Sequence, residues 1–598
     1  MHYELNKWRG ALFCLCLAFA AAGCSMSDDY DCPPEGGLAN SGKTYIRLSF
    51  AMPGSGSTRA TGGELGNGQE AGQNQENKIS SAIAFLYKGN GVNDDAKTPI
   101  AAVVEFDNPD GTGAGTDRPD TEHDIDKVYT TAAKELPEIE FDTYHVIVAA
   151  NLSENDNTGW WNGANLTLGN VRDHILTKAW TPEADGSYSN FLMTNESDAF
   201  IELTEKNTSA NPAETTVDVE RVAARVDYKT KNSYTIENEN TNVSGTITIN
   251  GAYIVNRLDA GSYFLKRVTE GDDINGEIEY LGNETADGNG VATNYVLDPW
   301  TKNKNTNNAD LNQNPFTVGG TKVNASKLYA DDTYFPNGSE DPEDWAGWCK
   351  EGDEATDPDD ENETWRRIGY CMENTTASDA TMKQYNTGIV FKAKFEPTGV
   401  NDYKPGNTFF TYDGKFYTSL TKMMGEINSE ENFASYVTEQ IENKDIDGIH
   451  TFAQTLKDDP VGYKTYLLNQ TGDKVYDWTE YLLNVLGVDE SDEDKGPQIN
   501  QITVGDEKTR AILYEKSGGR IRTYYNGQCY YIWWLRHSDN NDDTTNGVME
   551  YAVVRNNIYK LDVTGVSSLG GDIPNVEGLV VHVYVHDWVM LDGETLPM

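Results

Sequence analysis

The sequence predicts an all-β protein made of two tandem β-sandwich domains, with a few short helices and long polar loop inserts. Three observations lead to this prediction. The chain has 598 residues, which is too long for one ordinary core. Apolar and polar residues alternate through most of its apolar segments, as they do in half-buried strands. Gly, Asn and Asp interrupt this alternation at short intervals, as expected where antiparallel strands turn.

Charge excludes nucleic acid as a partner. The chain has 96 acidic and 47 basic residues, and its formal net charge is −49. Binding a polyanion requires an excess of Lys and Arg that neutralises phosphates. We therefore expect an acidic, well-solvated outer surface.

Residues 1–23 predict a lipoprotein signal peptide. A short basic region with Lys7 and Arg9 precedes an apolar run and then small residues up to Cys24. The sequence AAGC at 21–24 is similar to a bacterial lipobox, so Cys24 is the candidate acylated residue. An ordinary signal peptide with a chance cysteine is the alternative. No later apolar run approaches about 18 residues, so we expect attachment to the membrane by lipid alone.

The following segments predict an N-terminal sandwich over 60–243, preceded by one further strand. This strand, TYIRLSFAM, has alternate apolar residues on one face, and these are Ile46, Leu48, Phe50 and Met52. A short helix is expected over 170–180. Further strands are predicted in AIAFLYKG, PIAAVVEF, YHVIVAAN, AFIELT, TTVDVERVAARVDYK and SGTITINGAYIVNRL.

A second sandwich is predicted over 244–598. Long polar tracts interrupt it and are expected to be loops, because they cannot bury enough apolar surface to form core. A second short helix is expected over 432–444. Asn526 and Gly527 favour a type I′ turn, which predicts a hairpin within RIRTYYNGQCYYIWWLRH.

The last strand is unusually apolar for a chain end. One face carries Leu579, Val581, Val583 and Val585, and the other carries His582, Tyr584 and His586. Eleven such residues extend about 36 Å, which is enough to cross a sandwich. An uncovered strand of this kind is an aggregation hazard, so we expect something to cover it.

No catalytic or metal-binding motif is present, and we expect no enzyme activity, metal or cofactor. The sequence contains no HExxH, GxSxG, P-loop or CxxC motif. His582 and His586 are about 13 Å apart along a strand, so they do not form a ligand pair. Cys349 and Cys371 form a disulfide or are buried as small apolar side chains, and both alternatives stay open.

The aromatic residues of YYIWWLRH have two interpretations. Exposed Trp533 and Trp534 could stack on sugar rings, whereas strand aromatics more often fill the core. We favour a core position for Tyr531 and Trp533, or for their neighbours on the other face of the strand.

Several segments together resemble a known family. They are the candidate acylated N-terminus with its lone downstream Arg59, and the runs VERVAARVDY, GYCMENT, NGQCYYIWWLRH and VVRNNIYKLDVTGV. In this order they are similar to the fimbrillins of Bacteroidales type V pili, and most similar to the major subunit of the short fimbria. The likeness extends over nearly the whole chain.

The resemblance implies transthyretin-like sandwiches and export to the outer-membrane surface as a lipoprotein. It implies that a trypsin-like, Arg-specific protease cleaves between Arg59 and Ala60, which makes 24–59 a lipidated propeptide. It also implies polymerisation by strand exchange, with other copies of the chain and with anchor and tip subunits as partners.

The two amphipathic strands give this mechanism a physical basis. Cleavage after Arg59 would release the strand with Ile46 to Met52 and leave a slot that the donor segment 576–598 of another copy could fill. We therefore expect a stalk subunit of an extracellular fimbrium that supports adhesion. The alternatives are a monomeric surface lipoprotein that binds glycans, and two ordinary strands that stay within one monomer.

Overall fold

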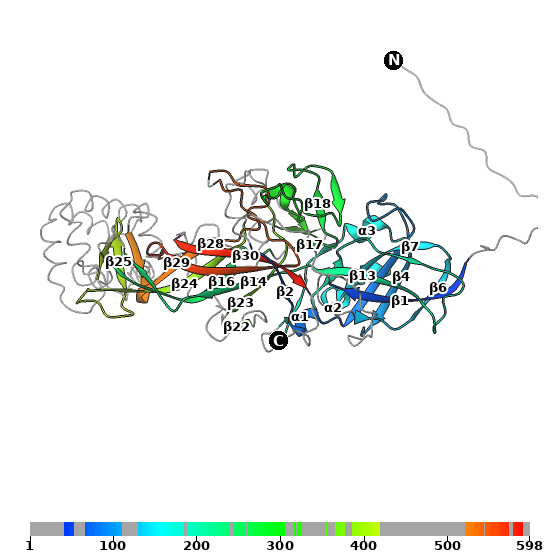
Figure 1. The fold of residues 1–598 in the computed structure, drawn as a ribbon, viewed down its shortest axis with the longest axis horizontal. Helices are drawn as coiled ribbons and strands as arrows, with labels where there is room; N and C mark the ends of the chain where they lie inside the picture. The colour runs from blue at the N-terminus through cyan, green and yellow to red at the C-terminus, as the bar shows by residue number, and fades with distance from the viewer. Residues whose placement is uncertain are drawn as a thin grey trace, which may run out of the picture.

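The computed structural model describes a large part of the chain, and its fold there is all-β (Figure 1). This confirms the predicted fold class. The described residues are 41–52, 66–109, 129–183, 188–237, 243–258, 261–304, 316–318, 321–323, 354–355, 365–376, 386–418, 521–542, 544–572, 574 and 578–589.

A nine-stranded sheet system forms the first part of the fold. Its main path runs in the order β4-β3-β7-β11-β13-β1-β5, with β12 paired to β7 and β6 paired to β1. The strands are β1 (Ser41–Ala51), β3 (Ser81–Tyr87), β4 (Ile100–Asp107), β5 (Tyr129–Thr130), β6 (Lys134–Glu140), β7 (Thr143–Ala150), β11 (Met193–Asn195), β12 (Phe200–Glu202) and β13 (Ala213–Arg221).

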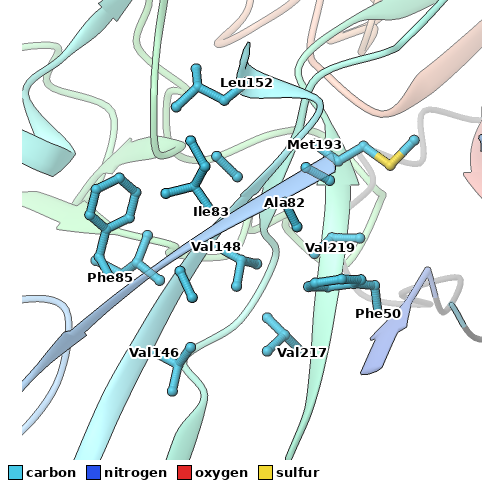
Figure 2. Packing of buried hydrophobic residues seen from close by; sticks show 14 of the residues in the cluster. Phe50, Ala82, Ile83, Phe85, Val146, Val148, Leu152, Met193, Val217 and Val219 are labelled. Atoms are coloured by element: carbon cyan, nitrogen blue, oxygen red, sulfur yellow. The ribbon is translucent and has the colours of Figure 1, made fainter. Parts of the chain in front are cut away.

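This sheet system encloses the first hydrophobic core. Successive side chains of a strand point to opposite faces of the sheet, so every second side chain points into the core. Figure 2 shows Phe50 of β1 beside Val217 and Val219 of β13, with Val148 of β7 nearby. The core thus joins strands that are far apart in the sequence.

Two further sheets enclose the second core. The six-stranded sheet has the order β2-β30-β29-β14-β23-β22, and the four-stranded sheet has the order β15-β16-β24-β28. Buried side chains from both sheets belong to one cluster, so the two sheets form a sandwich. The strands are β2 (Gly66–Ala71), β14 (Ala224–Thr230), β15 (Tyr234–Ile236), β16 (Gly245–Val255), β22 (Glu354–Ala355), β23 (Trp365–Cys371), β24 (Gly388–Pro397), β28 (Gln528–Trp534), β29 (Asn557–Val566) and β30 (Leu579–Val589).

Smaller elements surround these sheets. One three-stranded sheet and several strand pairs comprise β25 (Phe409–Tyr412), β26 (Lys415–Tyr417), β27 (Ile521–Tyr524), β8 (Ile175–Leu176), β17 (Ser262–Tyr263), β9 (Thr181–Pro182), β10 (Tyr188–Ser189), β18 (Arg267–Thr269), β19 (Ile278–Tyr280), β20 (Phe316–Val318) and β21 (Thr321–Val323). The helical elements are α1 (Asn74–Asn77), α2 (Leu152–Asn155), α3 (Leu168–Arg172), α4 (Thr301–Lys304), η1 (Trp160–Asn162) and η5 (Tyr525–Gly527).

The chain crosses from the first sheet system to the second core at Val222 and Ala223. The strand β13 ends at Arg221 and pairs with β1, whereas β14 begins at Ala224 and pairs with β29 and β23. The main strands change sheet at this point, and the domain boundary expected at 243–244 stays a prediction. The run VERVAARVDY has no Gly or Pro at the crossing, so the pattern of alternation does not reveal it.

The prediction of a helix over 170–180 is largely wrong. The helix α3 ends at Arg172, and Ile175 and Leu176 pair instead with β17. Leu176 is buried in the first core, so strand pairing and burial override the helical spacing. The helix expected over 432–444 lies outside the described residues.

The prediction of a hairpin at Asn526 and Gly527 is also wrong, although a turn forms at these two residues. Both residues have positive φ, at 51° and 75°, as a type I′ turn requires. However, β27 pairs with β25, and β28 pairs with β24. The turn therefore carries the chain from one sheet to another, because each flanking strand finds a partner distant in sequence.

Candidate strand-exchange site

The strand β1 is paired along both of its edges. On one side it runs parallel to β13, from Ile46 opposite Ala213 to Ala51 opposite Asp218. On the other side it is antiparallel to β6 and β5. The Leu48 backbone NH donates to Thr131 Oγ1 at 3.0 Å, and the Leu48 carbonyl accepts from the Thr131 NH at 2.9 Å. Removal of β1 would leave backbone groups unpaired on both sides of its slot.

The inner face of β1 is completely buried. Ile46, Leu48 and Phe50 are 0% exposed, and Met52, just beyond the strand, is 1% exposed. All four belong to the first core. Each such side chain contributes about 1.5–3 kcal/mol of transfer free energy.

The outer face of β1 carries exposed ion pairs and side-chain hydrogen bonds. Lys43 Nζ lies 2.7 Å from Glu135, and Arg47 Nη1 lies 2.8 Å from Glu214. Hydrogen bonds donated by Lys43 and Tyr45 hold the pKa of the Glu135 carboxyl below its usual value. Such exposed pairs add little stability, so β1 is held by its apolar face and its backbone ladders.

The C-terminal strand β30 also lies between two neighbours. It is antiparallel to β29, with a register shift between Val563 and Gly565, and parallel to β2. Its inner face is buried in the second core by Leu579, Val581, Val583 and Val585. The opposite face is exposed at Val580 and His582. His586 is half-buried beside Glu70, so it does not pair with His582.

The far end of β30 is held at the junction of the two cores. Trp588 is fully buried and belongs to the first core. Its ring stacks on Tyr370 with centroids 5.8 Å apart, and the Arg221 guanidinium lies 4.3 Å from its centroid. Arg221 also donates to the Trp588 carbonyl at 2.7 Å. Burial lowers the pKa of the Arg221 guanidinium.

The strands β1 and β30 therefore share three properties. Each has 11 residues. Each buries alternate side chains in a core. Each has a parallel neighbour on one edge and antiparallel neighbours on the other. The two strands are therefore alike in length, alternation and the directions of their neighbours.

Several predicted site residues lie outside the described residues, namely Cys24, Arg59, Ala60 and Cys349. Cys371 is buried with a free thiol, as is Cys529. Burial of Cys371 agrees with the alternative of a small apolar side chain, and the disulfide to Cys349 stays a prediction because Cys349 lies outside the described residues.

The aromatic residues of β28 do not form an exposed platform. Tyr531 is fully buried and Trp534 is 9% exposed. Trp533 is half-buried and packs against the second core. The favoured core position therefore holds for Tyr531 and largely for Trp533, and β28 gives no support to a glycan-stacking surface.

Sequence reasoning missed the polar junction between the two cores. Arg221, Arg225 and Asp227 belong to the run VERVAARVDY and are all buried. A signal was available, since charged residues in an otherwise apolar alternating run must find buried partners. The partners, however, come from residues as distant as Glu70 and Trp588.

Neither a metal centre nor a membrane-spanning helix is found in the part of the chain that the structure describes. No group of three or more His, Cys, Asp and Glu there is placed to hold a metal ion. None of the helices there is both long and apolar enough to cross a bilayer.

A family model matches the end of the chain. The match covers residues 522–593, and the model describes the C-terminal part of fimbrillin, the major fimbrial subunit protein type IV. Residues 522–593 are therefore similar to the C-terminal part of fimbrillins. The matched segment comprises most of β27 together with β28, β29 and β30, and so includes the candidate donor strand. The match supports a role as a fimbrial subunit. A comparison with curated proteins found no match.

Three solved structures are among those similar to this chain. A putative cell adhesion protein from Parabacteroides distasonis is 11% identical, with a TM-score of 0.34, and the alignment covers 91% of this chain and all of that one. The fimbrilin FimA of Porphyromonas gingivalis is 13% identical, with a TM-score of 0.32 and coverage of 92% and 99%. The tip fimbrial protein Mfa3 of the same species is 9% identical, with a TM-score of 0.28 and coverage of 92% and 100%. At these sequence identities and TM-scores, the similarities give no information about the function of this chain.

Proposed function

We propose that the protein is a stalk subunit of a surface fimbrium. It is exported as a lipoprotein acylated at Cys24 and reaches the outer-membrane surface. An Arg-specific, trypsin-like protease cleaves it between Arg59 and Ala60. The β1 segment then leaves the first sheet system, and β30 of another copy takes its place.

The observation that carries this proposal is the likeness between β1 and β30. The slot of β1 takes an 11-residue strand with alternate buried side chains, parallel to β13 and antiparallel to β5 and β6. The strand β30 has the same length and alternation, and it has the same mixture of neighbours in its present sheet. It also lies within the segment that is similar to the C-terminal part of fimbrillins.

Filling the empty slot is favourable, but β30 must first leave its own sheet and its place in the second core. An empty slot exposes apolar side chains of the first core and the unpaired edges of β13, β5 and β6. A donor strand re-forms these backbone ladders and covers the apolar side chains of the slot, while its own four apolar side chains exchange burial in the second core for burial in the first. A head-to-tail contact that does not close on itself produces a filament.

The test is limited proteolysis of the purified precursor, followed by gel electrophoresis without boiling. We expect a new N-terminus at Ala60 and then a ladder of multimers. Arg59→Ala should abolish both. Arg47→Ala is the matched control, because Arg47 lies in β1 with only an exposed partner, and this variant should keep both.

A second variant tests the donor. Deletion of everything after Val576 should leave the cut at Arg59 intact and abolish the ladder. Polymerisation of the truncated protein would contradict the assignment of β30. A monomer that persists after the cut and binds polysaccharide would favour the glycan-binding alternative instead.

A further inference from the structure

One short strand separates β30 from solvent at the edge of its sheet. The strand β2 pairs with β30 in parallel, from Gly66 opposite Tyr584 to Ala71 opposite Val589. Its sequence is GNGQEA, which contains no large apolar side chain. Apolar burial therefore does not hold β2 in place, and another interaction must do so.

That interaction is a buried carboxylate. Glu70 is 2% exposed, and Lys560 Nζ of β29 lies 2.7 Å from its Oε2. Arg225 of β14 donates to its Oε1. Since β30 lies between β2 and β29 in the sheet, both ion pairs reach across β30 to the strands beyond it. Lys560 of β29 lies opposite Tyr584 of β30. Residues paired across neighbouring strands project to the same face of a sheet, so the side chains of Lys560 and Tyr584 lie on one face.

The helix α1, which follows β2, is held by a second buried carboxylate. Glu76 is 0% exposed, and its carboxylate accepts from Arg225 at 3.3 Å, from Arg367 at 3.4 Å and from the Tyr370 hydroxyl. Arg367 also donates to Gln73 Oε1 at 2.8 Å. Carboxylates from β2 and α1 therefore converge with Asp227 on the single guanidinium of Arg225.

Gly72 allows this close approach. It lies between β2 and α1, and a Cβ added there would lie 2.8 Å from both Arg221 Nη2 and Trp588 Nε1, and closer still to Asn77 Oδ1. The backbone of this segment is therefore pressed against the residues that hold the end of β30.

The position of this segment in the chain gives it a role. It begins after Arg59, so it stays with the mature chain after the proposed cut. The connection that contains Arg59 joins β1 in the first sheet system to β2 in the second core. A cut there removes the covalent link to β1 but none of the contacts of Glu70 and Glu76.

The geometry points to residues 66–77, here called the strap, as an intramolecular restraint that keeps β30 in its own sheet after cleavage at Arg59. Donation of β30 to another copy then requires displacement of the strap, and this part of the inference rests on the proposed function. Free cleaved subunits stay closed until a slot on another copy competes for β30.

Hydrogen exchange on the uncleaved monomer tests the restraint without any polymerisation. In Glu70→Ala we expect the amides of β30 to exchange about tenfold faster or more than in the unaltered protein, with β16 unchanged. The matched control is Glu135→Ala, which removes an exposed carboxylate paired with Lys43 and should leave β30 unchanged. A change in β30 below about twofold, or the same factor in β16, would overturn the inference.

Two further variants keep the test independent of folding. Glu70→Gln keeps the size of the side chain and one acceptor oxygen, so it should keep the fold and accelerate β30 exchange by a smaller factor. Gly72→Val leaves every charge in place but displaces the strap by crowding, and it should also accelerate exchange in β30. Protection of β30 equal to that of the unaltered protein in both variants would contradict the strap.

Polymerisation then separates this inference from the proposed function. After cleavage, Glu70→Gln should produce the ladder faster than the unaltered protein. Faster exchange in β30 with no ladder in any variant would support the strap and refute the polymer. A normal ladder with unchanged protection of β30 would refute the strap and leave the polymer standing.

Discussion

Phe50 is completely buried although it lies one residue before the end of β1. Its ring lies beside Val217 and Val219 of the parallel neighbour β13 (Figure 2). Truncation of this ring leaves a cavity between two strands that the rest of the core cannot easily close. The stability of the closed precursor therefore depends on this one side chain.

We expect Phe50→Ala to lower the free energy of unfolding of the precursor by about 3–5 kcal/mol. Urea unfolding measures this change. Ser49→Ala is the control, since Ser49 alternates to the opposite face of the strand and hydrogen-bonds Thr130 at 3.1 Å. Ser49→Ala should change the free energy of unfolding by less than about 1.5 kcal/mol. Equal effects of the two substitutions would contradict the buried-face assignment.

His174 gives the first sheet system a pH dependence. Its ring stacks on Trp160 with centroids 4.1 Å apart, and its Nε2 lies 3.2 Å from Asp156 Oδ2. Burial lowers the pKa of His174 below its ordinary value of 6.5, although Asp156 acts in the opposite direction. The neutral imidazole is therefore favoured in the folded state. Its stabilising contribution is complete above pH 6.5 and is lost as the pH falls below that value.

Thermal unfolding between pH 7.5 and pH 5 measures this effect. The unaltered protein should lose stability across the range, and His174→Gln should show a weaker dependence on pH. His582→Gln, at an exposed position of β30, should keep the dependence of the unaltered protein. A His174→Gln profile parallel to that of the unaltered protein would refute the assignment.

At the scale of the element, β30 has one face for a core and one for solvent. Val583 is 4% exposed and Val580 is 48% exposed. In the proposed polymer, the same face of β30 enters the core of the neighbouring copy. Val583→Ala should therefore weaken each joint by about 2 kcal/mol. The multimer ladder of this variant should dissociate at a lower temperature on gels.

Val580→Ala provides the comparison, because the same two methyl groups are removed from the exposed face. Its ladder should dissociate at the same temperature as that of the unaltered protein. If Val580→Ala weakens the ladder more than Val583→Ala, β30 enters the slot with the opposite face or does not enter it.

The sequence predicts some elements well and others not at all. The strands β1 and β30 are predicted from alternation, because one face of each is buried along most of its length. The strand β2 is not predicted, since GNGQEA has neither alternation nor β-branched residues. It is a strand because Glu70 finds partners on β14 and β29, and these become neighbours only in the folded chain.

At the scale of the whole molecule, buried charges join the two cores. Arg555 lies 2.6 Å from Glu373, and Lys266 lies 3.1 Å from Glu220 at the end of β13. Arg555 also donates to the carbonyl groups of Tyr263 and Phe264. Loss of one partner leaves a buried charge uncompensated, which is more costly than the pair itself is stabilising.

Arg555→Ala should therefore lower the free energy of unfolding by about 3–5 kcal/mol. Calorimetry is the suitable measurement, because loss of the junction should also separate the unfolding of the two cores into two transitions. Arg47→Ala removes an exposed pair and should cost at most about 1 kcal/mol. A single transition with an unchanged midpoint in Arg555→Ala would refute a structural role for this cluster.

The division into two cores is predictable from length and alternation, whereas the way they join is not. The order of strands in the six-stranded sheet combines residues from 66–71, 224–230 and 579–589. No local pattern indicates such a combination, because the pairing depends on contacts across several hundred residues. The charged residues of VERVAARVDY indicate a polar junction but not its partners.

The two-residue crossing at Val222 and Ala223 has a mechanical consequence. The strand β13 borders the slot of β1, and β14 is separated from β30 by β29 alone. In a fibre under tension, force would enter through the strand in the slot, pass to β13 and reach β14 through two buried residues with no slack. It would leave through β29 and the connection to β30, which in the polymer lies in the slot of the next copy. The ladders between β14 and β29 and between β13 and the slot strand would be loaded in shear rather than opened one bond at a time. Each subunit would thus transmit a pull with little extension.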